Sequence, residues 1–174
     1  MSAQFDAPRI VIDRLGHLGD GIGAGAEGAV HVPLAAPGDV FARDPTVETG
    51  WRLIEAGKAR AEPPCRHFGV CGGCNLQHVS VELYAQSKRE WVIAALENQG
   101  LRPVVDALVP AAPGTRRRAS FAAIGRKDGA LIGFHRARSH EIIEVPHCLV
   151  VRPRMIKALA AVRDMLTERL GPGR

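Results

Sequence analysis

Four cysteines are the residues of this sequence with the clearest capacity for chemistry. Three of them, Cys65, Cys71 and Cys74, fall within ten positions, and a pair of glycines separates the last two. A Cys-x2-Cys pair on a glycine-rich loop brings two thiolates to one side of the backbone, because glycine adopts the unusual φ values that such a loop needs. A cubane iron–sulfur cluster needs four thiolates, and Cys148 is the only remaining candidate for the fourth.

Zinc is the competing ligand for these cysteines. Four thiolates, or three together with His67, His78 or His147, would satisfy tetrahedral Zn²⁺. Structural zinc sites usually pair two short Cys-x2–4-Cys units, whereas this sequence contains one. Disulfides are disfavoured, because the N-terminus lacks a secretory signal pattern and a cytoplasmic location is expected. The spacing therefore favours an iron–sulfur cluster and leaves zinc and unliganded buried thiols open.

Charge is distributed unevenly along the chain. Residues 1–62 carry 6 Lys and Arg against 9 Asp and Glu, a balance of −3, whereas residues 63–174 carry 17 against 9, a balance of +8. Basic surfaces attract phosphate backbones through counterion release, although a merely solvated arginine surface would give the same count. No apolar run approaches the roughly 18 residues of a membrane span, so no membrane partner is expected.

The element pattern predicts an α+β fold of two domains. Residues 1–62 predict a small OB-like β-barrel with a glycine-rich turn over residues 16–25, strands at 9–15, 29–33 and 39–42, and an ambiguous segment at 51–56. The strands after Asp39 are short and interrupted, which allows for an open or trimmed barrel. The glycines are not followed by a helix, so a phosphate-binding loop is disfavoured there.

Residues 63–174 predict a domain in which the cysteine loop is followed by helices and antiparallel strands. The expected elements are a helix capped by Ser80 and ending near Gln99, strands at 118–124, 130–136 and 141–145, and a last helix at 154–170. Apolar residues recur at helical spacing in the first helix and are expected to face the core: Val81, Tyr84, Trp91 and Ala95.

The residues around the cysteines follow a longer pattern. Residues 63–78 read Pro-Pro-Cys-Arg-His-Phe-Gly-Val-Cys-Gly-Gly-Cys-Asn-Leu-Gln-His. This stretch closely resembles the cluster-binding loop of the bacterial RNA uracil-C5 methyltransferases. The resemblance continues through the following helix, Arg-Arg-Arg-Ala at 116–119 and residues 139–148. Near the N-terminus, Gly-Asp-Gly-Ile-Gly at 19–23 and Ala-Pro-Gly-Asp at 36–39 are similar to the family's TRAM domain, a small RNA-binding barrel.

The resemblance implies a bound cofactor, an RNA partner and a catalytic domain that this chain is expected to lack. It implies that Cys65, Cys71, Cys74 and Cys148 bind a [4Fe–4S] cluster, and that both domains bind structured ribosomal or transfer RNA. In the family, a separate C-terminal Rossmann-like domain binds S-adenosylmethionine and supplies a catalytic cysteine. Neither a suitable glycine-rich strand–turn–helix nor a fifth cysteine follows here. We therefore expect no catalytic or S-adenosylmethionine-binding residue in this chain, and no RNA methylation by it alone.

Two functions are consistent with these expectations. The first is the RNA-binding, cluster-carrying N-terminal portion of an RNA uracil-C5 methyltransferase, present as a fragment or as the partner of a separately encoded methyltransferase domain. The alternative is a stand-alone, non-enzymatic RNA-binding protein with an iron–sulfur or zinc site. DNA is not an expected partner of either. The basic residues expected to contact RNA are Arg116, Arg117, Arg118, His135, Arg136 and Arg138, on or beside the predicted hairpin, and Lys88 on the first helix.

Overall fold

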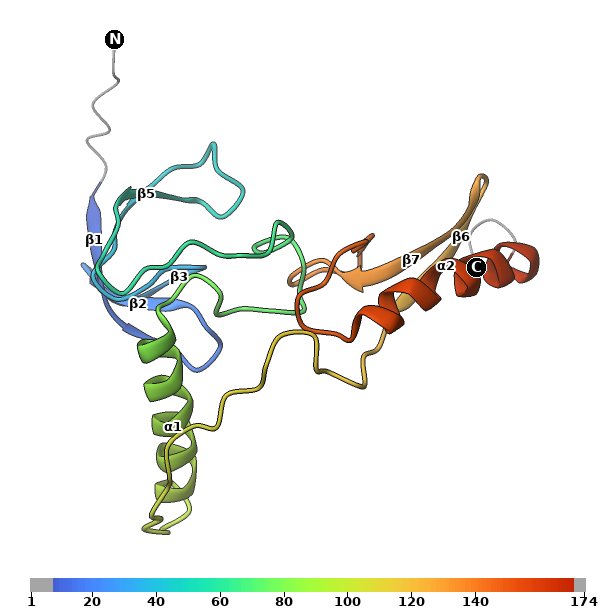
Figure 1. Cartoon of the computed structure of the whole chain (residues 1–174). Helices are drawn as coiled ribbons and strands as arrows, with labels where there is room; N and C mark the ends of the chain where they lie inside the picture. Colours follow the sequence, from blue (N-terminus) through green and yellow to red (C-terminus); the bar gives the residue numbers. More distant parts are fainter. Residues whose placement is uncertain (1–7, 171–174) are drawn as a thin grey trace. The chain divides into compact units, whose positions relative to one another are not determined.

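The computed structural model describes residues 8–170 and divides into two compact units, whose elements are labelled in Figure 1. Unit 1 comprises Met1–Pro64 and Asn75–Val109, and unit 2 comprises Cys65–Cys74 and Pro110–Arg174. The expected domains, 1–62 and 63–174, stay a prediction. The units group the chain differently, since the helix after the cysteine loop belongs to unit 1 while the loop itself belongs to unit 2.

Unit 1 contains a five-stranded antiparallel sheet with the order β3-β2-β1-β4-β5. Its strands are β1 (Arg9–Leu15), β2 (Gly21–Gly25), β3 (Gly28–Val32), β4 (Val40–Arg43) and β5 (Trp51–Glu55). The first residues of β1 pair with β4 and the later ones with β2, across a register irregularity between Ile12 and Arg14. Within residues 8–170 no pairing joins the edge strands β3 and β5, so the sheet is open and no closed barrel is found; the OB-like barrel stays a prediction.

The glycine-rich segment forms a strand as well as a turn, which corrects the expectation of a turn over residues 16–25. The tight turn is confined to residues 16–20, where the Gly16 amide donates to the Asp20 carbonyl at 2.7 Å. The following glycines lie in β2 because the strand packs closely on its neighbours. A β-carbon added at Gly21 would lie 2.7 Å from side-chain carbons of both Ile12 and Ala35.

Two groups of buried side chains form the core of unit 1. The first lies on the sheet and consists of Ile10, Ile12, Val32, Ala35, Phe41 and Trp51. The second joins the end of β1 to the segment after the cysteine loop and consists of Leu15, Ala36, Leu76 and Val79. Helix α1 (Val81–Glu97) packs on this second group through Leu83 and Trp91. Within residues 8–170 no helix is long and apolar enough to cross a membrane.

Helix α1 begins and ends as its sequence predicts but buries a different face. The Ser80 hydroxyl accepts a hydrogen bond from the Leu83 amide, and Gly100 beyond the last turn has a φ of +75°. Val81 is 76% exposed, and Tyr84 and Ala95 are also exposed, so the expectation that these three residues belong to the core is wrong. The packed face follows i, i+4, i+8 spacing from Leu83 through the small, buried Ser87 to Trp91.

Unit 2 contains a three-stranded antiparallel sheet and helix α2 (Pro153–Arg169). The strands β6 (Ala122–Arg126), β7 (Gly129–His135) and β8 (Ile142–Ile143) pair in the order β6-β7-β8. The predicted hairpin and last helix are therefore confirmed, but β6 begins four residues later than expected. The stretch just before the expected strand pairs with another segment instead, since the Arg116 amide donates to the Val150 carbonyl at 3.1 Å.

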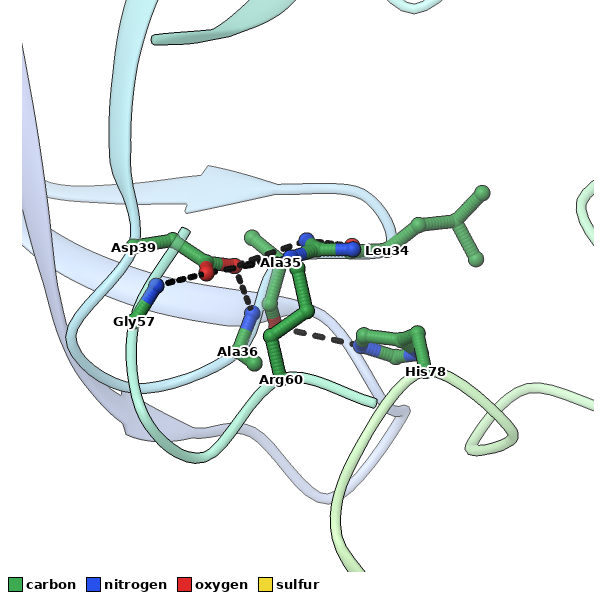
Figure 2. A network of polar contacts seen from close by, with 7 residues as sticks. All are labelled: Leu34, Ala35, Ala36, Asp39, Gly57, Arg60 and His78. Carbon is green, nitrogen blue, oxygen red and sulfur yellow. Dashed lines mark hydrogen bonds and ion pairs between the residues drawn. The ribbon is translucent and has the colours of Figure 1, made fainter. Parts of the chain in front are cut away.

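A buried polar network closes the loops of unit 1, as Figure 2 shows. Asp39 has no exposed surface, and its carboxylate accepts hydrogen bonds from the Ala36 amide at 2.6 Å and the Gly57 amide at 2.9 Å. The Arg60 guanidinium donates to the same carboxylate at 2.7 Å and to the Leu34 carbonyl at 2.7 Å. One carboxylate thus ties together the loop before β4 and the segment after β5.

His78 adds the segment after the cysteine loop to this network. Its ring Nε2 lies 3.2 Å from the Ala35 carbonyl oxygen, and because a carbonyl can only accept, Nε2 carries the hydrogen. The side chain is buried. Burial lowers the pKa of His78 below its ordinary value, and the Arg60 cation lowers it further, against opposing effects of the Ala35 carbonyl, Asp39 and Asp20. The folded chain therefore holds this ring neutral at a pH where an exposed histidine gains a proton.

We expect unit 1 to lose stability as the pH falls below about 6.5, the ordinary histidine pKa. The unfolded chain takes up a proton there that the folded ring resists, so stability is full above this pH and declines toward the lower pKa of the folded state. Urea unfolding followed by tryptophan fluorescence measures this, since both tryptophans lie in unit 1. His78→Gln should reduce the loss of unfolding free energy at low pH. His31→Gln, a change at an exposed position, should leave this loss as it is in the unaltered chain. A pH-independent unfolding free energy in the unaltered chain would contradict the assignment.

Candidate metal-binding loop and the basic recess beside it

The cysteine loop, residues 65–74, is a series of tight turns. The Phe68 amide donates to the Cys65 carbonyl at 2.9 Å, and the Cys71 amide donates to the His67 carbonyl at 2.8 Å. Gly69, between these turns, has a φ of +85°, a left-handed conformation that residues with a β-carbon rarely adopt. The chain therefore folds back on itself between the first and second cysteines.

The loop is attached to the end of β7 by backbone pairing. The Gly72 amide donates to the His135 carbonyl at 2.9 Å, and the Ala137 amide donates to the Val70 carbonyl at 2.8 Å. A β-carbon added at Gly72 would lie 3.1 Å from the His135 carbonyl oxygen, tighter than ordinary contacts. Glycine at this position thus permits the loop to pack directly on the sheet, a role that its sequence position does not reveal.

Cys148 belongs to a second segment of the same unit. It follows β8 and lies between Val145 and Val151, both of which are buried. The segment is held by pairing with the stretch before β6, where the Gly114 amide donates to the Leu149 carbonyl at 2.8 Å. All four cysteines are therefore carried by unit 2, on two segments that hydrogen bonds fix independently.

The four thiols are half-buried and none forms a disulfide. Burial raises the pKa of the Cys71 thiol, the Gly73 amide opposes this through a 3.4 Å hydrogen bond, and Cys74, Cys148 and Cys65 each raise the pKa further. The other three thiols thus act on the pKa of Cys71 in the direction expected of negative charges. Within residues 8–170, however, no three His, Cys, Asp or Glu side chains form a group that could hold one metal ion. Unit 2 thus supplies thiol side chains of the type that binds metals, but its described residues are not grouped around one point.

The three histidines considered as zinc ligands have different surroundings. His78 belongs to unit 1, where its Nε2 hydrogen-bonds the Ala35 carbonyl. His147 is exposed beside Cys148. His67 lies in the cysteine loop, and its Nε2 is buried without a hydrogen-bond partner among the described residues. A buried polar nitrogen without a partner is energetically unfavourable. An additional hydrogen-bond acceptor or a bound ligand would therefore stabilise His67.

A recess of about 630 Å³ opens beside the loop. Its wall consists of Gly72 and Gly73, Ser120, and residues 134–136 and 138–140 at the end of β7 and in the turn that follows. Two histidine rings, one phenylalanine ring, two guanidinium groups and two hydroxyl groups therefore surround one concave space. All of these residues belong to unit 2.

The residues predicted to contact RNA separate into three places. His135, Arg136 and Arg138 line the recess, together with six residues absent from the predicted set of contacts: Gly72, Gly73, Ser120, Phe134, Ser139 and His140. A further group, Arg116, Arg117 and Arg118, is exposed on the stretch before β6, also in unit 2. Lys88 lies on α1 in unit 1, half-buried, with its ammonium 5.2 Å from the centroid of the Trp91 ring.

The two units carry opposite net charge. By sequence, unit 2 has 14 Lys and Arg against 5 Asp and Glu, a balance of +9, and unit 1 has 9 against 13, a balance of −4. The charge difference between the two units is larger than the difference between residues 63–174 and residues 1–62, because the acidic α1 region belongs to unit 1. The cysteines, the recess and the exposed arginines thus share the unit that attracts anions.

Comparisons with known proteins bear on this arrangement. No family model matches the chain. It is 41% identical over 164 residues to an uncharacterized RNA methyltransferase of Rhizobium meliloti, covering 90% of this chain and 40% of the relative. An uncharacterized RNA methyltransferase of Brucella suis is 43% identical over 90% of the chain and 38% of its own length. The 23S rRNA (uracil(1939)-C(5))-methyltransferase RlmD of Halomonas elongata is 33% identical over 94% of the chain and 36% of its own length. The chain thus spans about two fifths of these relatives.

Proposed function

We propose that this chain, which is similar to part of bacterial RNA methyltransferases, is the RNA-binding, [4Fe–4S]-carrying part of a uracil-C5 methyltransferase. The observation that carries the proposal is that one unit, with a balance of +9, holds the four cysteines, the basic recess and the exposed arginines. The substrate is a structured ribosomal or transfer RNA, met in the cytoplasm. Methyl transfer from S-adenosylmethionine belongs to the portion of the relatives that this chain does not span.

Cys65, Cys71, Cys74 and Cys148 would hold the cluster. Three features of the chain support this assignment. The thiols are not consumed in disulfides, three of them influence the fourth electrostatically, and the buried His67 Nε2 in the same loop has no partner among the described residues. A cluster supplies negatively charged sulfur atoms, which accept hydrogen bonds from such a nitrogen when it carries its hydrogen.

The proposed role of the cluster is structural. Cys148 and the loop cysteines lie on segments that are held by separate backbone hydrogen bonds, the first to the stretch before β6 at Gly114–Leu149 and the second to the end of β7 at Gly72–His135. When bound, the cluster would cross-link these two segments covalently. The cross-link would hold the recess wall formed by Gly72 and Gly73 against the end of β7.

We assign unit 1 a secondary part in RNA binding. Its open five-stranded sheet is proposed as a TRAM-like domain. With a balance of −4 it does not attract phosphate by its net charge, so its contribution to RNA binding would come from local groups. The principal phosphate contacts are assigned to Arg116, Arg117 and Arg118, which are exposed and consecutive in unit 2.

Replacing Arg116, Arg117 and Arg118 together with alanine is expected to weaken binding to a structured ribosomal RNA fragment. Each phosphate contact releases about 0.7 to 0.9 of a counterion, so losing three contacts should reduce the slope of log K against log salt by about two to three. Fluorescence anisotropy over a salt series measures both quantities. Transfer RNA and duplex DNA serve as comparison probes, with DNA expected to bind more weakly.

The matched control removes the same charge from the same unit at other exposed positions, by Arg126→Ala, Lys127→Ala and Arg169→Ala together. This control should retain most of the salt slope. Equal slopes for the two triple variants would show that only net charge matters and would exclude the three consecutive arginines as phosphate contacts. Failure of the unaltered chain to bind any RNA would contradict the proposed function itself.

A further inference from the structure

The recess beside the cysteine loop has a rigid wall. The turn after β7 is fixed by backbone bonds, since the Arg136 amide donates to the Glu141 carbonyl at 2.8 Å and the Ser139 amide donates to the Arg136 carbonyl at 3.2 Å. The Glu141 amide donates in turn to the Ser139 hydroxyl at 3.0 Å. On the opposite side of this turn, the Ala137 amide is held by the Val70 carbonyl of the cysteine loop at 2.8 Å. The side chains of the turn therefore project from a backbone with little freedom.

Arg138 lies in this turn with a φ of +56°. Residues other than glycine, asparagine and aspartate rarely adopt this left-handed conformation, because their side chains make it unfavourable. Backbone strain of this kind persists where the surrounding structure imposes it, and it is found more often at binding sites than elsewhere. The residue that carries this strain is an exposed arginine that lines the recess.

The rings of the recess are positioned as well. Phe134 packs against Phe121 with 4.7 Å between the ring centroids. The Nδ1 of His135 lies 3.1 Å from the His140 carbonyl oxygen, so Nδ1 donates and, in the neutral ring, Nε2 is left as an acceptor. The His135 and His140 rings meet edge to face at 6.1 Å. The lining of the recess therefore combines three aromatic rings, from Phe134, His135 and His140, with the hydroxyl groups of Ser120 and Ser139.

These features select a chemical class of ligand. A volume of about 630 Å³ is within the usual range for small-molecule pockets. Aromatic faces suit the π-face of an unstacked base, and arginine at the rim suits a phosphate. A free phosphate would leave the rings without a role, and a regular duplex presents its backbone to the protein and keeps its bases stacked inside. An unpaired nucleotide uses both the rings and the guanidinium groups.

We propose that the recess bounded by Gly72, Phe134, His140 and Arg138 binds one unpaired nucleotide of the RNA substrate, with the base against the rings and its phosphate at Arg138. This inference rests on the proposed RNA-binding function and extends it from phosphate contacts to recognition of an exposed base. The RNA bound by this unit then carries a loop or bulge next to the segment that contacts Arg116, Arg117 and Arg118.

Two point variants test the recess with little change to its backbone. Arg138→Asn removes the guanidinium, and asparagine tolerates the left-handed conformation. His140→Ala removes an exposed ring. Anisotropy titrations of the metal-loaded full chain would compare a short RNA hairpin that has an unpaired loop with the fully paired duplex of the same stem. Arg126→Asn, exposed at the end of β6, is the control of equal charge.

Each recess variant is expected to weaken hairpin binding roughly tenfold and to change duplex binding less than twofold, because stacking and its phosphate contact exist only for the unpaired base. Arg126→Asn should affect both RNAs alike. A 5-iodouracil in the hairpin loop should photo-cross-link to the peptide that contains Phe134 and His140. Equal losses on hairpin and duplex, or no loss from either variant, would overturn the nucleotide site. The proposed function would still stand if the Arg116–Arg118 triple variant flattened the salt slope.

Discussion

Replacing Cys148 with serine is expected to destroy the [4Fe–4S] cluster of the anaerobically purified chain. The hydroxyl oxygen is a harder ligand than thiolate and is not ionised at neutral pH, so the fourth iron loses its anchor. We expect iron to fall from about four atoms per chain to about three or fewer, with a matching loss of the brown colour. Iron and acid-labile sulfide assays measure this directly. The same change should loosen the recess, because the cross-link between the Cys148 segment and the cysteine loop is lost.

The control for this variant is Leu149→Ser, which introduces serine at the neighbouring, exposed position and leaves all four thiols in place. It should keep its iron. If Cys148→Ser also kept about four iron atoms per chain, Cys148 would not be a ligand. Loss of iron from both variants would indicate that the segment after β8 had unfolded, and hydrogen exchange of β6 and β7 would reveal this.

Asp39→Asn is expected to reduce the unfolding free energy of unit 1 by about 3–5 kcal/mol. The fully buried carboxylate balances the Arg60 guanidinium and accepts two backbone amides. The amide has one acceptor oxygen and no charge, so the variant leaves a half-buried cation without its counterion and places an NH₂ group against backbone donors. Urea unfolding followed by the fluorescence of Trp51 and Trp91 reports on this unit.

Asp13→Asn is the matched control, since Asp13 is exposed on β1 of the same sheet, and its effect should be within about 0.5 kcal/mol. A double variant with Arg60→Gln should lose less than the sum of the two single changes, because the second change removes the stranded cation. An Asp39→Asn effect below about 1 kcal/mol would mean that the network does not hold the loops together.

Sequence signals were most informative where local chemistry decides the structure. The Ser80 helix cap, the end of that helix near Gln99 and the hairpin that β6 and β7 form are all confirmed, because each depends on backbone atoms a few residues away. The face that α1 buries was not predictable in this way. It depends on Ser87, a small polar residue that the hydrophobic pattern passes over but that a close-packed interface accommodates.

The candidate site shows the same contrast. Residue type and spacing identify the four cysteines, and the resemblance assigns them a cluster. The recess depends instead on tertiary contacts that join Gly72 to His135, and on the positive φ of Arg138. Nothing in the local sequence distinguishes Arg138, which lines the recess, from Arg117, which lies outside it. The pairing of the cysteine loop with β7 is what places Arg138, and not Arg117, in the lining of the recess.

The central claim is that the four cysteines hold one [4Fe–4S] cluster. Native mass spectrometry of the chain, purified and kept without oxygen, measures what it carries. We expect a mass increase equal to about four iron and four sulfide, lost on oxidation, with no zinc. One zinc per chain, with no iron or sulfide, would contradict it.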